Sequence, residues 1–310
     1  LFLAAVVLLF APAWVYGYVV KRKAPAKAGA VIDEKGFDGL GAETARITSR
    51  DGLRLHAYYL PREGAGGYAL LAHGYTADAR FLLPEAELFR ERLRFNVLLP
   101  DARGHGLSEG SYSGFGWHER LDCLDWIQWL LARAERDAPG RDPRVVLYGV
   151  SMGAATVMMA SGEEDLPPQV AAVIEDCGYT SLEEELAWQM KKRWHVQSRR
   201  LLMAAGDYTK KKAGFSFAEV SAINRLRKSK TPTLFIHGDA DDFVPFGMVH
   251  SLYGACRAPK ELYVVKGAAH AASRAAFPEA YEEHLRAFIE KYVFNKTESA
   301  VNALDHKEPS

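Results

Sequence analysis

Ser151 lies between two glycines, in the pentapeptide Gly149-Val150-Ser151-Met152-Gly153. The apolar run at 144–150 predicts a strand before it, and the run at 154–160 predicts a helix after it. A turn this tight leaves no room for side chains two positions either side of the serine, so glycine is required there. We expect the turn to hold Ser151 in a strained conformation with its hydroxyl exposed, as a nucleophile requires.

A serine hydroxyl is a weak nucleophile at neutral pH and needs a base, usually a histidine, to take its proton. His270 follows the last predicted strand, 261–265, on a loop of small residues from which it can reach over the sheet. None of the other nine histidines stands just past the final strand. We therefore predict His270 as the general base. His73, His105 and His237 are assigned to holding loops through hydrogen bonds, and the others to strand, helix or tail surfaces.

Three carboxylates follow the preceding predicted strand, 233–237: Asp239, Asp241 and Asp242. A single one can accept the imidazole proton in good geometry, and it must lie beyond the turn that ends the strand. We predict Asp241 for this role, with Asp239 as a cap of the loop and Asp242 as a cap of the next helix. Asp176, which follows the predicted strand 170–175, is the alternative acid.

Attack on a carbonyl also needs donors for the negative charge that develops on its oxygen. The backbone amide of Met152, directly after the nucleophile, is one candidate. The amide of Tyr75 is the other, because it follows the predicted strand 68–72 and Gly74 allows the chain to turn inward. Each such donor is worth about 3 kcal/mol of transition-state stabilisation.

Short apolar runs recur with helical patterns between them, at 68–72, 96–100, 144–150, 170–175, 233–237 and 261–265. Because these runs are continuous, we expect strands covered on both faces, in a mostly parallel sheet. Two earlier runs, 44–49 and 53–60, flank Asp51-Gly52 and predict a hairpin. The alternation predicts a doubly wound α/β architecture, closed by an amphipathic helix over 278–294.

One interval breaks this alternation, because more than fifty residues separate the strands at 176 and 233. From Ser181 to Lys230 there are 12 Lys or Arg against 5 Asp or Glu, with Trp188 and Trp194 among them. We predict a helical lid insertion over about 181–230, above the carboxyl ends of the strands. Its cations are either solvated helix faces or a surface for an anionic membrane or an acidic substrate. The whole domain is predicted at 44–294, after a linker at 21–43 and before a flexible polar tail at 295–310.

Residues 1–20 carry no charge and are mostly apolar, and Lys21-Arg22-Lys23 follows them. Twenty helical residues span about 30 Å, the thickness of one hydrocarbon core. We predict a membrane anchor here, while Ala11-Pro12-Ala13 leaves open a cleaved signal segment and a secreted protein. The basic flank favours a cytoplasmic domain, but basic residues upstream would reverse this orientation, so the side of the membrane stays open.

Composition argues against several other classes of protein. Lys plus Arg and Asp plus Glu each number 39, which gives no indication of a nucleic-acid partner. Cys123, Cys177 and Cys256 are too few and too widely spaced for a disulfide framework or a metal cluster, and we expect buried thiols. Because no metal, nucleotide or dinucleotide pattern is found, no cofactor is expected.

From 46 to 294 the chain resembles the α/β-hydrolase superfamily. The matching stretches are His73-Gly74-Tyr75, the segment 101–110, the Ser151 turn, 237–245 and 267–270. It is similar in particular to bacterial membrane-anchored serine hydrolases of the serine aminopeptidase-like and monoglyceride-lipase-like group. The order Ser151, Asp241, His270 along the chain is that of the superfamily. The resemblance implies an eight-stranded sheet with helices on both faces, segment 101–110 as a structural brace, these three residues as a triad, the Tyr75 and Met152 amides as oxyanion hole, and no cofactor.

These residues lead us to expect a serine hydrolase that cleaves acyl bonds through an acyl-enzyme. A carboxylesterase acting on short or medium acyl esters is the leading hypothesis. A serine peptidase, monoacylglycerol lipase, thioesterase or acyltransferase with the same triad stays open, as does, more remotely, a non-catalytic binding protein. No motif indicates the natural substrate or the oligomeric state.

Overall fold

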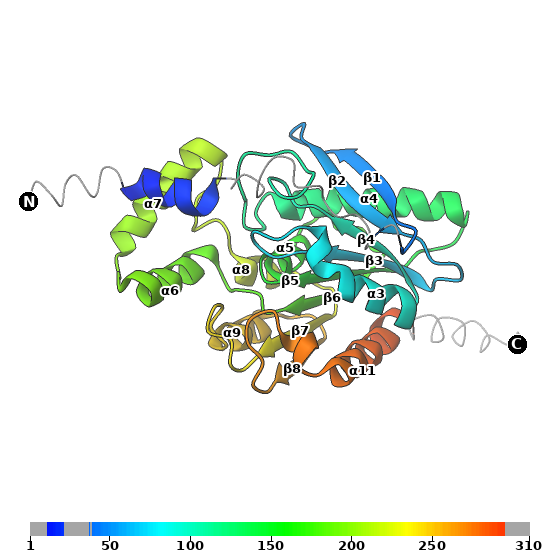
Figure 1. Ribbon diagram of the computed structural model, residues 1–310. Coiled ribbons are helices and arrows are strands. Elements are labelled where there is room, and N and C mark those ends of the chain that lie inside the picture. The colour runs from blue at the N-terminus through cyan, green and yellow to red at the C-terminus, as the bar shows by residue number, and fades with distance from the viewer. Residues whose placement is uncertain (1–10, 22–36, 38, 295–310) are drawn as a thin grey trace, which may run out of the picture.

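An eight-stranded sheet forms the centre of the computed structural model, which describes residues 11–21, 37 and 39–294 (Figure 1). The strands stand in the order β1-β2-β4-β3-β5-β6-β7-β8. β2 is antiparallel to both of its neighbours, and the remaining pairs are parallel. The strands are β1 (Glu43–Thr48), β2 (Arg54–Leu60), β3 (Gly67–Ala72), β4 (Phe95–Pro100), β5 (Val145–Val150), β6 (Val170–Asp176), β7 (Thr233–Gly238) and β8 (Lys260–Val265). The predicted mostly parallel α/β sheet is therefore confirmed.

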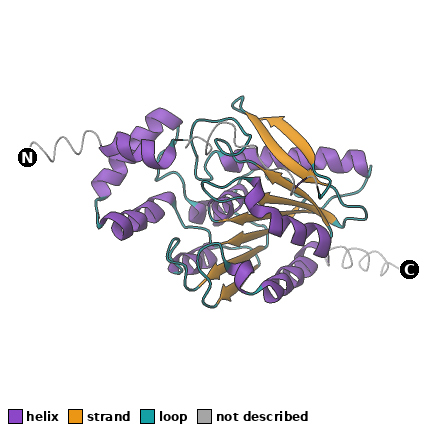
Figure 2. Ribbon diagram, viewed as in Figure 1, coloured by secondary structure: helices purple, strands orange, loops and turns teal. Residues whose placement is uncertain are grey.

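Helices cover both faces of this sheet (Figure 2). They are α3 (Leu83–Glu87), α4 (Glu119–Asp137), α5 (Met152–Ala160), α6 (Leu182–Trp194), α7 (Arg199–Ala213), α8 (Ala222–Leu226), α9 (Gly247–Ala255), α10 (Ser273–Ala276) and α11 (Pro278–Ile289). The predicted closing helix over 278–294 is α11, continued by a π-helical turn, η4 (Glu290–Phe294).

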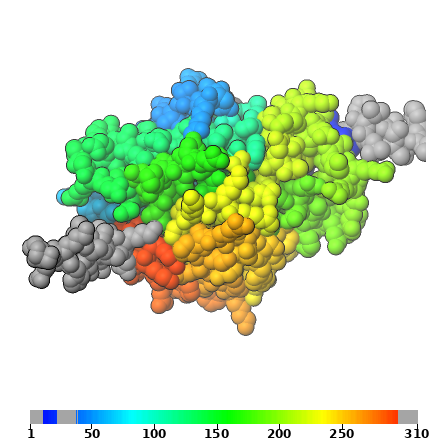
Figure 3. All heavy atoms as spheres, turned by 180° about the vertical axis from the view of Figure 1, so that it is seen from behind, coloured from blue at the N-terminus to red at the C-terminus, as the bar shows by residue number. Residues whose placement is uncertain are grey.

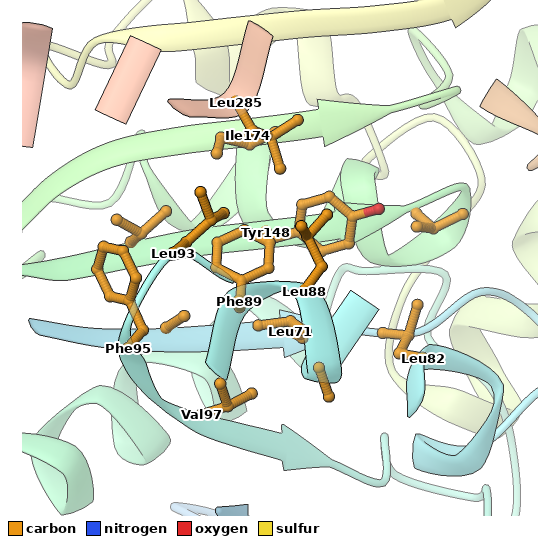
Figure 4. Packing of buried hydrophobic residues seen from close by; sticks show 14 of the residues in the cluster. Leu71, Leu82, Leu88, Phe89, Leu93, Phe95, Val97, Tyr148, Ile174 and Leu285 are labelled. Carbon is orange, nitrogen blue, oxygen red and sulfur yellow. The ribbon is translucent and has the colours of Figure 1, made fainter. Parts of the chain in front are cut away.

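Successive side chains of the central strands enter different hydrophobic clusters, because strand side chains alternate between the two faces. Leu71, Tyr148 and Ile174 pack against α11 and against Phe89 of the π-helical turn η3 (Leu88–Arg92) (Figure 4). Their neighbours on the opposite face, Leu70, Leu147 and Val173, pack with α4 around Trp126. Burial on both faces explains why these strands are continuous apolar runs in the sequence.

The carboxyl ends of the parallel strands meet at one edge of the sheet. Ala72 of β3 pairs with Gly149 of β5, and Val150 pairs with Asp176 of β6. Asp176 in turn pairs with Ile236 of β7. The loops that leave these strands are therefore brought together at this edge, where ligands bind in open α/β sheets.

Between β6 and β7, where we predicted a helical lid, the chain forms α6, α7 and α8. The Ser181 hydroxyl accepts from Glu184 N at the start of α6, and Ser198 caps α7 in the same way. His195 ends α6 in a left-handed conformation, and α7 then turns away. α6 and α7 lie at one end of the molecule, and α11 lies toward the other (Figures 1 and 3).

The N-terminal segment packs beside α7 (Figure 1). Residues 11–15 are helical and continue into a π-helical turn, η1 (Tyr16–Val20). Ser113 N donates to Val20 O at 2.9 Å, and the Tyr16 and Tyr208 rings lie 5.7 Å apart. Within the described residues, no helix has both the length and the apolar character needed to cross a membrane.

Several predicted segments fall partly or wholly outside the described residues. These are residues 1–10 of the predicted anchor, most of the linker and the tail at 295–310. Within the predicted linker, Phe37 is buried and stacks on Tyr58 with ring centroids 3.9 Å apart. This part of the linker is packed on the domain, a contact that its composition did not indicate.

Candidate active site

Ser151 lies on the sharp turn between β5 and α5, with φ of +57° and ψ of −115°. A non-glycine residue rarely adopts this conformation, which stores strain at functional sites. The turn is possible because a Cβ at Gly149 would collide with the backbone of Gly153, and one at Gly153 with the Ala72 carbonyl. The steric requirement read from the glycine spacing is thus met in three dimensions.

The structure brings His270 and Asp241 to this serine. His270 Nε2 lies 2.9 Å from Ser151 Oγ, and His270 Nδ1 lies 2.8 Å from Asp241 Oδ2. An ionised carboxylate can only accept, so the imidazole carries its proton on Nδ1 and leaves Nε2 to accept the serine proton. Three groups linked in this way can act as a nucleophile, a base and an orienting acid.

Asp241 is buried, and both of its carboxylate oxygens have hydrogen-bond partners. Its side chain is fully buried, and its Oδ1 accepts from the amides of Phe243 and Val244 at 2.9 Å each. Burial alone would raise the pKa of Asp241, but hydrogen bonds from His237 and His270 outweigh it and hold the pKa at about 2. The carboxylate is therefore ionised throughout the physiological range.

The other carboxylates near this edge have different partners. Asp176 accepts from the Ser273 and Tyr281 hydroxyls at 2.9 Å each, and Asp239 accepts from Gly267 N. Asp242 was predicted to cap the following helix, and this is wrong. α9 begins at Gly247, too far along the chain for Asp242 to reach its first turn, and the Asp242 carboxylate instead lies 2.6 Å from Lys192 Nζ on α6.

His237 is a contact of Asp241 that the sequence interpretation missed. It was assigned to loop support, and its Nε2 does lie 3.1 Å from Val244 O. The same Nε2 lies 3.3 Å from Asp241 Oδ2. The spacing His237 to Asp241 was the available signal, because both flank the turn at the end of β7.

Glu175 is a second buried group near this site that the sequence interpretation did not single out. It stands on β6, fully buried, and Oε2 accepts from Gly178 N at 2.9 Å. Burial raises the pKa of Glu175 to about 8, against a smaller opposing effect of His237. Among the described residues, Glu175 Oε1 and His237 Nδ1 both lack a hydrogen-bond partner.

The backbone beside the serine comes from the loop after β3. A Cβ at Gly74 would lie 3.4 Å from Ser151 Cβ, so this loop passes directly over the nucleophile. Tyr75 follows it, and Met152 opens α5, where the first amides of a helix have no intrahelical acceptor. Both residues predicted to offer an amide therefore adjoin Ser151.

The segment 101–110 braces the loops at this edge. Asp101 lies 2.9 Å from His56 Nδ1 and accepts from the amides of Ala79 and Leu107. His56 was placed on a strand surface by its sequence position, but it is buried here. His73 holds the neighbouring loop, because its Nε2 accepts from Ala102 N at 3.0 Å.

A cavity of about 130 Å³ lies beside Ser151. Its wall is mostly apolar and comes from the N-terminal segment, the loops at the sheet edge, α6 and α7. The lining residues are Val15, Tyr18, Val19, Tyr75, Phe115, Met152, Tyr179, Leu182, Glu185, Leu186, Gln189, Met190, Arg193, Trp194, Leu202, Phe243 and Val244. An apolar chain joined to a polar bond at the serine fits such a wall.

The three cysteines are buried, as expected. Cys177 offers its sulfur within 4.8 Å of ligand atoms of Asp241 and His270. Burial raises the pKa of the Cys177 thiol well above its ordinary value, which keeps it protonated and a poor metal ligand. His270 Nδ1 is also engaged by Asp241, so the donor set suits a hydrogen-bonded network better than a metal ion.

A model of the alpha/beta hydrolase family matches residues 69–284, and the chain belongs to this family. It is 28% identical over 244 residues to the uncharacterised protein YqkD of Bacillus subtilis, across 79% of this chain and 78% of that protein. It is 27% identical over 240 residues to the uncharacterised protein YfhR of Escherichia coli K12, across 76% and 75%.

Among solved structures, a Pyrococcus furiosus esterase, Pf2001, superposes with a TM-score of 0.67 at 22% identity. The match covers 88% of this chain and 99% of the esterase. At this identity the likeness shows the shared fold. Together with the family match it supports a hydrolase.

Proposed function

We propose that this chain is a serine hydrolase that cleaves acyl bonds, with Ser151 as nucleophile, His270 as general base and Asp241 as orienting acid. The two hydrogen bonds that link Ser151 to His270 and His270 to Asp241 carry this proposal. Its leading form is a carboxylesterase acting on short or medium acyl esters, which the apolar wall beside Ser151 supports.

In this proposal Ser151 Oγ attacks the ester carbonyl while His270 Nε2 takes its proton. The negative charge on the carbonyl oxygen is met by the amides of Tyr75 and Met152. His270 then returns the proton to the leaving alcohol, which breaks the ester bond and leaves an acyl-enzyme. Water, deprotonated by the same imidazole, attacks this acyl group, and His270 returns the proton to Ser151 Oγ as the acid leaves.

The test is hydrolysis of p-nitrophenyl esters of increasing chain length by wild type, Ser151→Ala and Ser161→Ala. Ser161 directly follows α5, and its buried hydroxyl donates to Met158 O. It is therefore a matched control. We expect loss of turnover and of fluorophosphonate labelling in Ser151→Ala alone. Ester turnover that survives in Ser151→Ala would refute the assignment.

The related activities are outcomes of the same assay. Faster cleavage of an aminoacyl p-nitroanilide than of any ester would make the chain a peptidase. A thioester preferred over its oxygen ester would indicate a thioesterase, and transfer to an added alcohol in place of water would indicate an acyltransferase. Each of these results keeps Ser151 and changes the substrate.

A further inference from the structure

Three aromatic side chains form an exposed patch where the N-terminal segment meets α6. The Trp14 and Tyr18 rings stack at 5.2 Å, and Trp194 meets them edge-on at 5.6 and 5.9 Å. Their exposed fractions are 55%, 44% and 39%. We call these three residues the aromatic rim. Large rings this exposed are costly in water unless something covers them.

The rim borders the cavity beside Ser151. Tyr18 and Trp194 both line that cavity and are both open to solvent on their outer side. Tyr75 OH ties the N-terminal segment to the same wall by donating to Val19 O at 2.6 Å. Whatever covers the rim therefore lies at the mouth of the cavity.

The last turn of α6 and the helix α7 that follows it are strongly basic, whereas the first turn of α6 carries three glutamates. Residues 190–213 contain eight Lys or Arg and one Asp, and all eight cations are exposed. Three of them have carboxylate partners, because Lys192 pairs with Asp242, Lys210 with Glu219 and Arg199, at 4.0 Å, with Glu183. The excess of one sign beside Trp and Tyr rings is the composition of surfaces that lie on anionic lipid.

The sequence that precedes the aromatic rim also favours a lipid surface. The described N-terminal segment starts at Ala11, three residues before Trp14, and the ten residues that precede it in the sequence are uncharged and almost all aliphatic. The described segment thus begins next to the rim, at the end of the molecule that α6 and α7 form (Figures 1 and 3). A lipid bilayer accommodates both this apolar sequence and the rim.

We propose that the aromatic rim and the cations of α6 and α7 dock on an anionic lipid bilayer, with the mouth of the cavity turned toward the membrane. A single-chain acyl ester could then pass from the bilayer along the rim to Ser151 without crossing water. The docking itself depends on the surface alone, and the choice of substrate rests on the proposed function.

The test is flotation of the full chain, carrying Ser151→Ala, with vesicles of phosphatidylcholine alone or mixed with phosphatidylglycerol. We expect binding to the mixed vesicles that weakens with salt. Arg200→Glu with Lys211→Glu, and separately Trp14→Asp, should lower the partition coefficient about tenfold or more. None of these three residues lines the cavity.

Matched controls change the same residue types elsewhere. Lys228→Glu with Lys230→Glu reverses two exposed charges that precede β7, at the opposite edge of the sheet. Phe277→Asp removes a ring that is 47% exposed beside α11. Both controls should bind like the parent chain. Equal binding by the rim variants and the parent, or binding to neutral vesicles as strong as to anionic ones, would overturn the docking proposal.

A second arm separates docking from catalysis. In the wild-type background, Arg200→Glu with Lys211→Glu should keep full activity on a soluble short-chain ester and lose activity on a monoacyl ester held in anionic vesicles. Equal activity on the vesicle ester would also contradict the proposal. If wild type cleaves no ester, thioester or anilide, the proposed function fails, while flotation of the Ser151→Ala chain still decides the docking.

Discussion

Two imidazoles share one carboxylate oxygen at the candidate active site, because His237 Nε2 lies 3.3 Å from Asp241 Oδ2, which is also the partner of His270 Nδ1. The second oxygen of Asp241 is held by two backbone amides. With both oxygens engaged and no exposed surface, the carboxylate has little freedom to rotate. His237 is thus placed to position Asp241, and through it His270.

Replacing His237 by Leu should lower kcat about tenfold with little change in KM, because one hydrogen bond to a buried carboxylate is worth about 1.5 kcal/mol or more. His237→Gln should recover most of the loss, since its amide nitrogen can reach the position of Nε2. Steady-state kinetics on a p-nitrophenyl ester measures both values. Fluorophosphonate labelling and thermal melting check that each variant is folded. Equal kcat for His237→Leu and wild type would show that the contact has no role in positioning.

Glu175 should make the protein less stable as pH rises. Its pKa of about 8 in the folded chain, raised by burial, exceeds that of an unfolded glutamate, about 4.3. Between these values the folded state holds a proton that the unfolded state has released, so the free energy of unfolding falls by up to about 1.4 kcal/mol per pH unit. His237 and Asp176 are among the groups that face Glu175. Their charges move the pH range over which stability falls, but stability still falls as pH rises.

Glu175→Gln should therefore be more stable than wild type at pH 8 and similar to it near pH 4. Urea unfolding at several pH values measures the difference. Glu283→Gln, which changes an exposed carboxylate on α11, is the control and should follow the wild-type curve. A Glu175→Gln curve parallel to that of wild type would mean that Glu175 is ionised in the folded protein.

The sequence predicted the eight strands and the loops of the candidate site because those features depend on local rules. Buried strands need continuous apolar residues, and the turn at Ser151 needs glycine where a Cβ would strike backbone. Asp241 was preferred among three neighbours because the acid must lie beyond the turn made by Gly238, and its carboxylate is the one that lies 2.8 Å from His270 Nδ1.

Contacts between distant segments were not predictable from these rules. The packing of residues 11–20 beside α7 and the stacking of Phe37 on Tyr58 depend on which surfaces meet in three dimensions. The uncharged N-terminal stretch indicated an anchor, and nothing in its sequence indicated that Tyr18 would line the cavity. The partner of Asp242 was missed for the same reason, since Asp242 lies in the loop after β7 and Lys192 on α6, far away in the sequence.

Tyr75→Phe separates the ring of Tyr75 from its amide. The change removes the hydrogen bond from the hydroxyl to Val19 O, at 2.6 Å, and leaves the backbone in place. If the amide is the oxyanion donor, kcat on an acetyl ester should stay within about twofold, whereas loss of such a donor costs about a hundredfold or more. We expect KM for longer acyl esters to rise, because the N-terminal wall of the cavity is less firmly held. A hundredfold loss of kcat on the acetyl ester would place the hydroxyl itself in the chemistry.

Glu185 should make the binding of acyl chains depend on pH. Its carboxyl lies in the cavity wall, where Oε1 accepts from Gln189 Nε2 at 2.8 Å, and burial raises its pKa to about 7. Below that pH it is neutral and compatible with an apolar chain. Above it the carboxylate carries a charge that loses water when the chain enters, which opposes binding.

KM for a medium-chain p-nitrophenyl ester should therefore rise as pH increases from about 6 to 9, through the pKa of Glu185. Glu185→Gln should remove this rise, because an amide stays neutral over the whole range. Glu219→Gln is the matched control, since Glu219 pairs with Lys210 outside the cavity and should keep the wild-type profile. A Glu185→Gln profile that still rises with pH would assign the effect to a different group, and an unchanged KM in wild type would mean that the acyl chain does not reach this part of the wall.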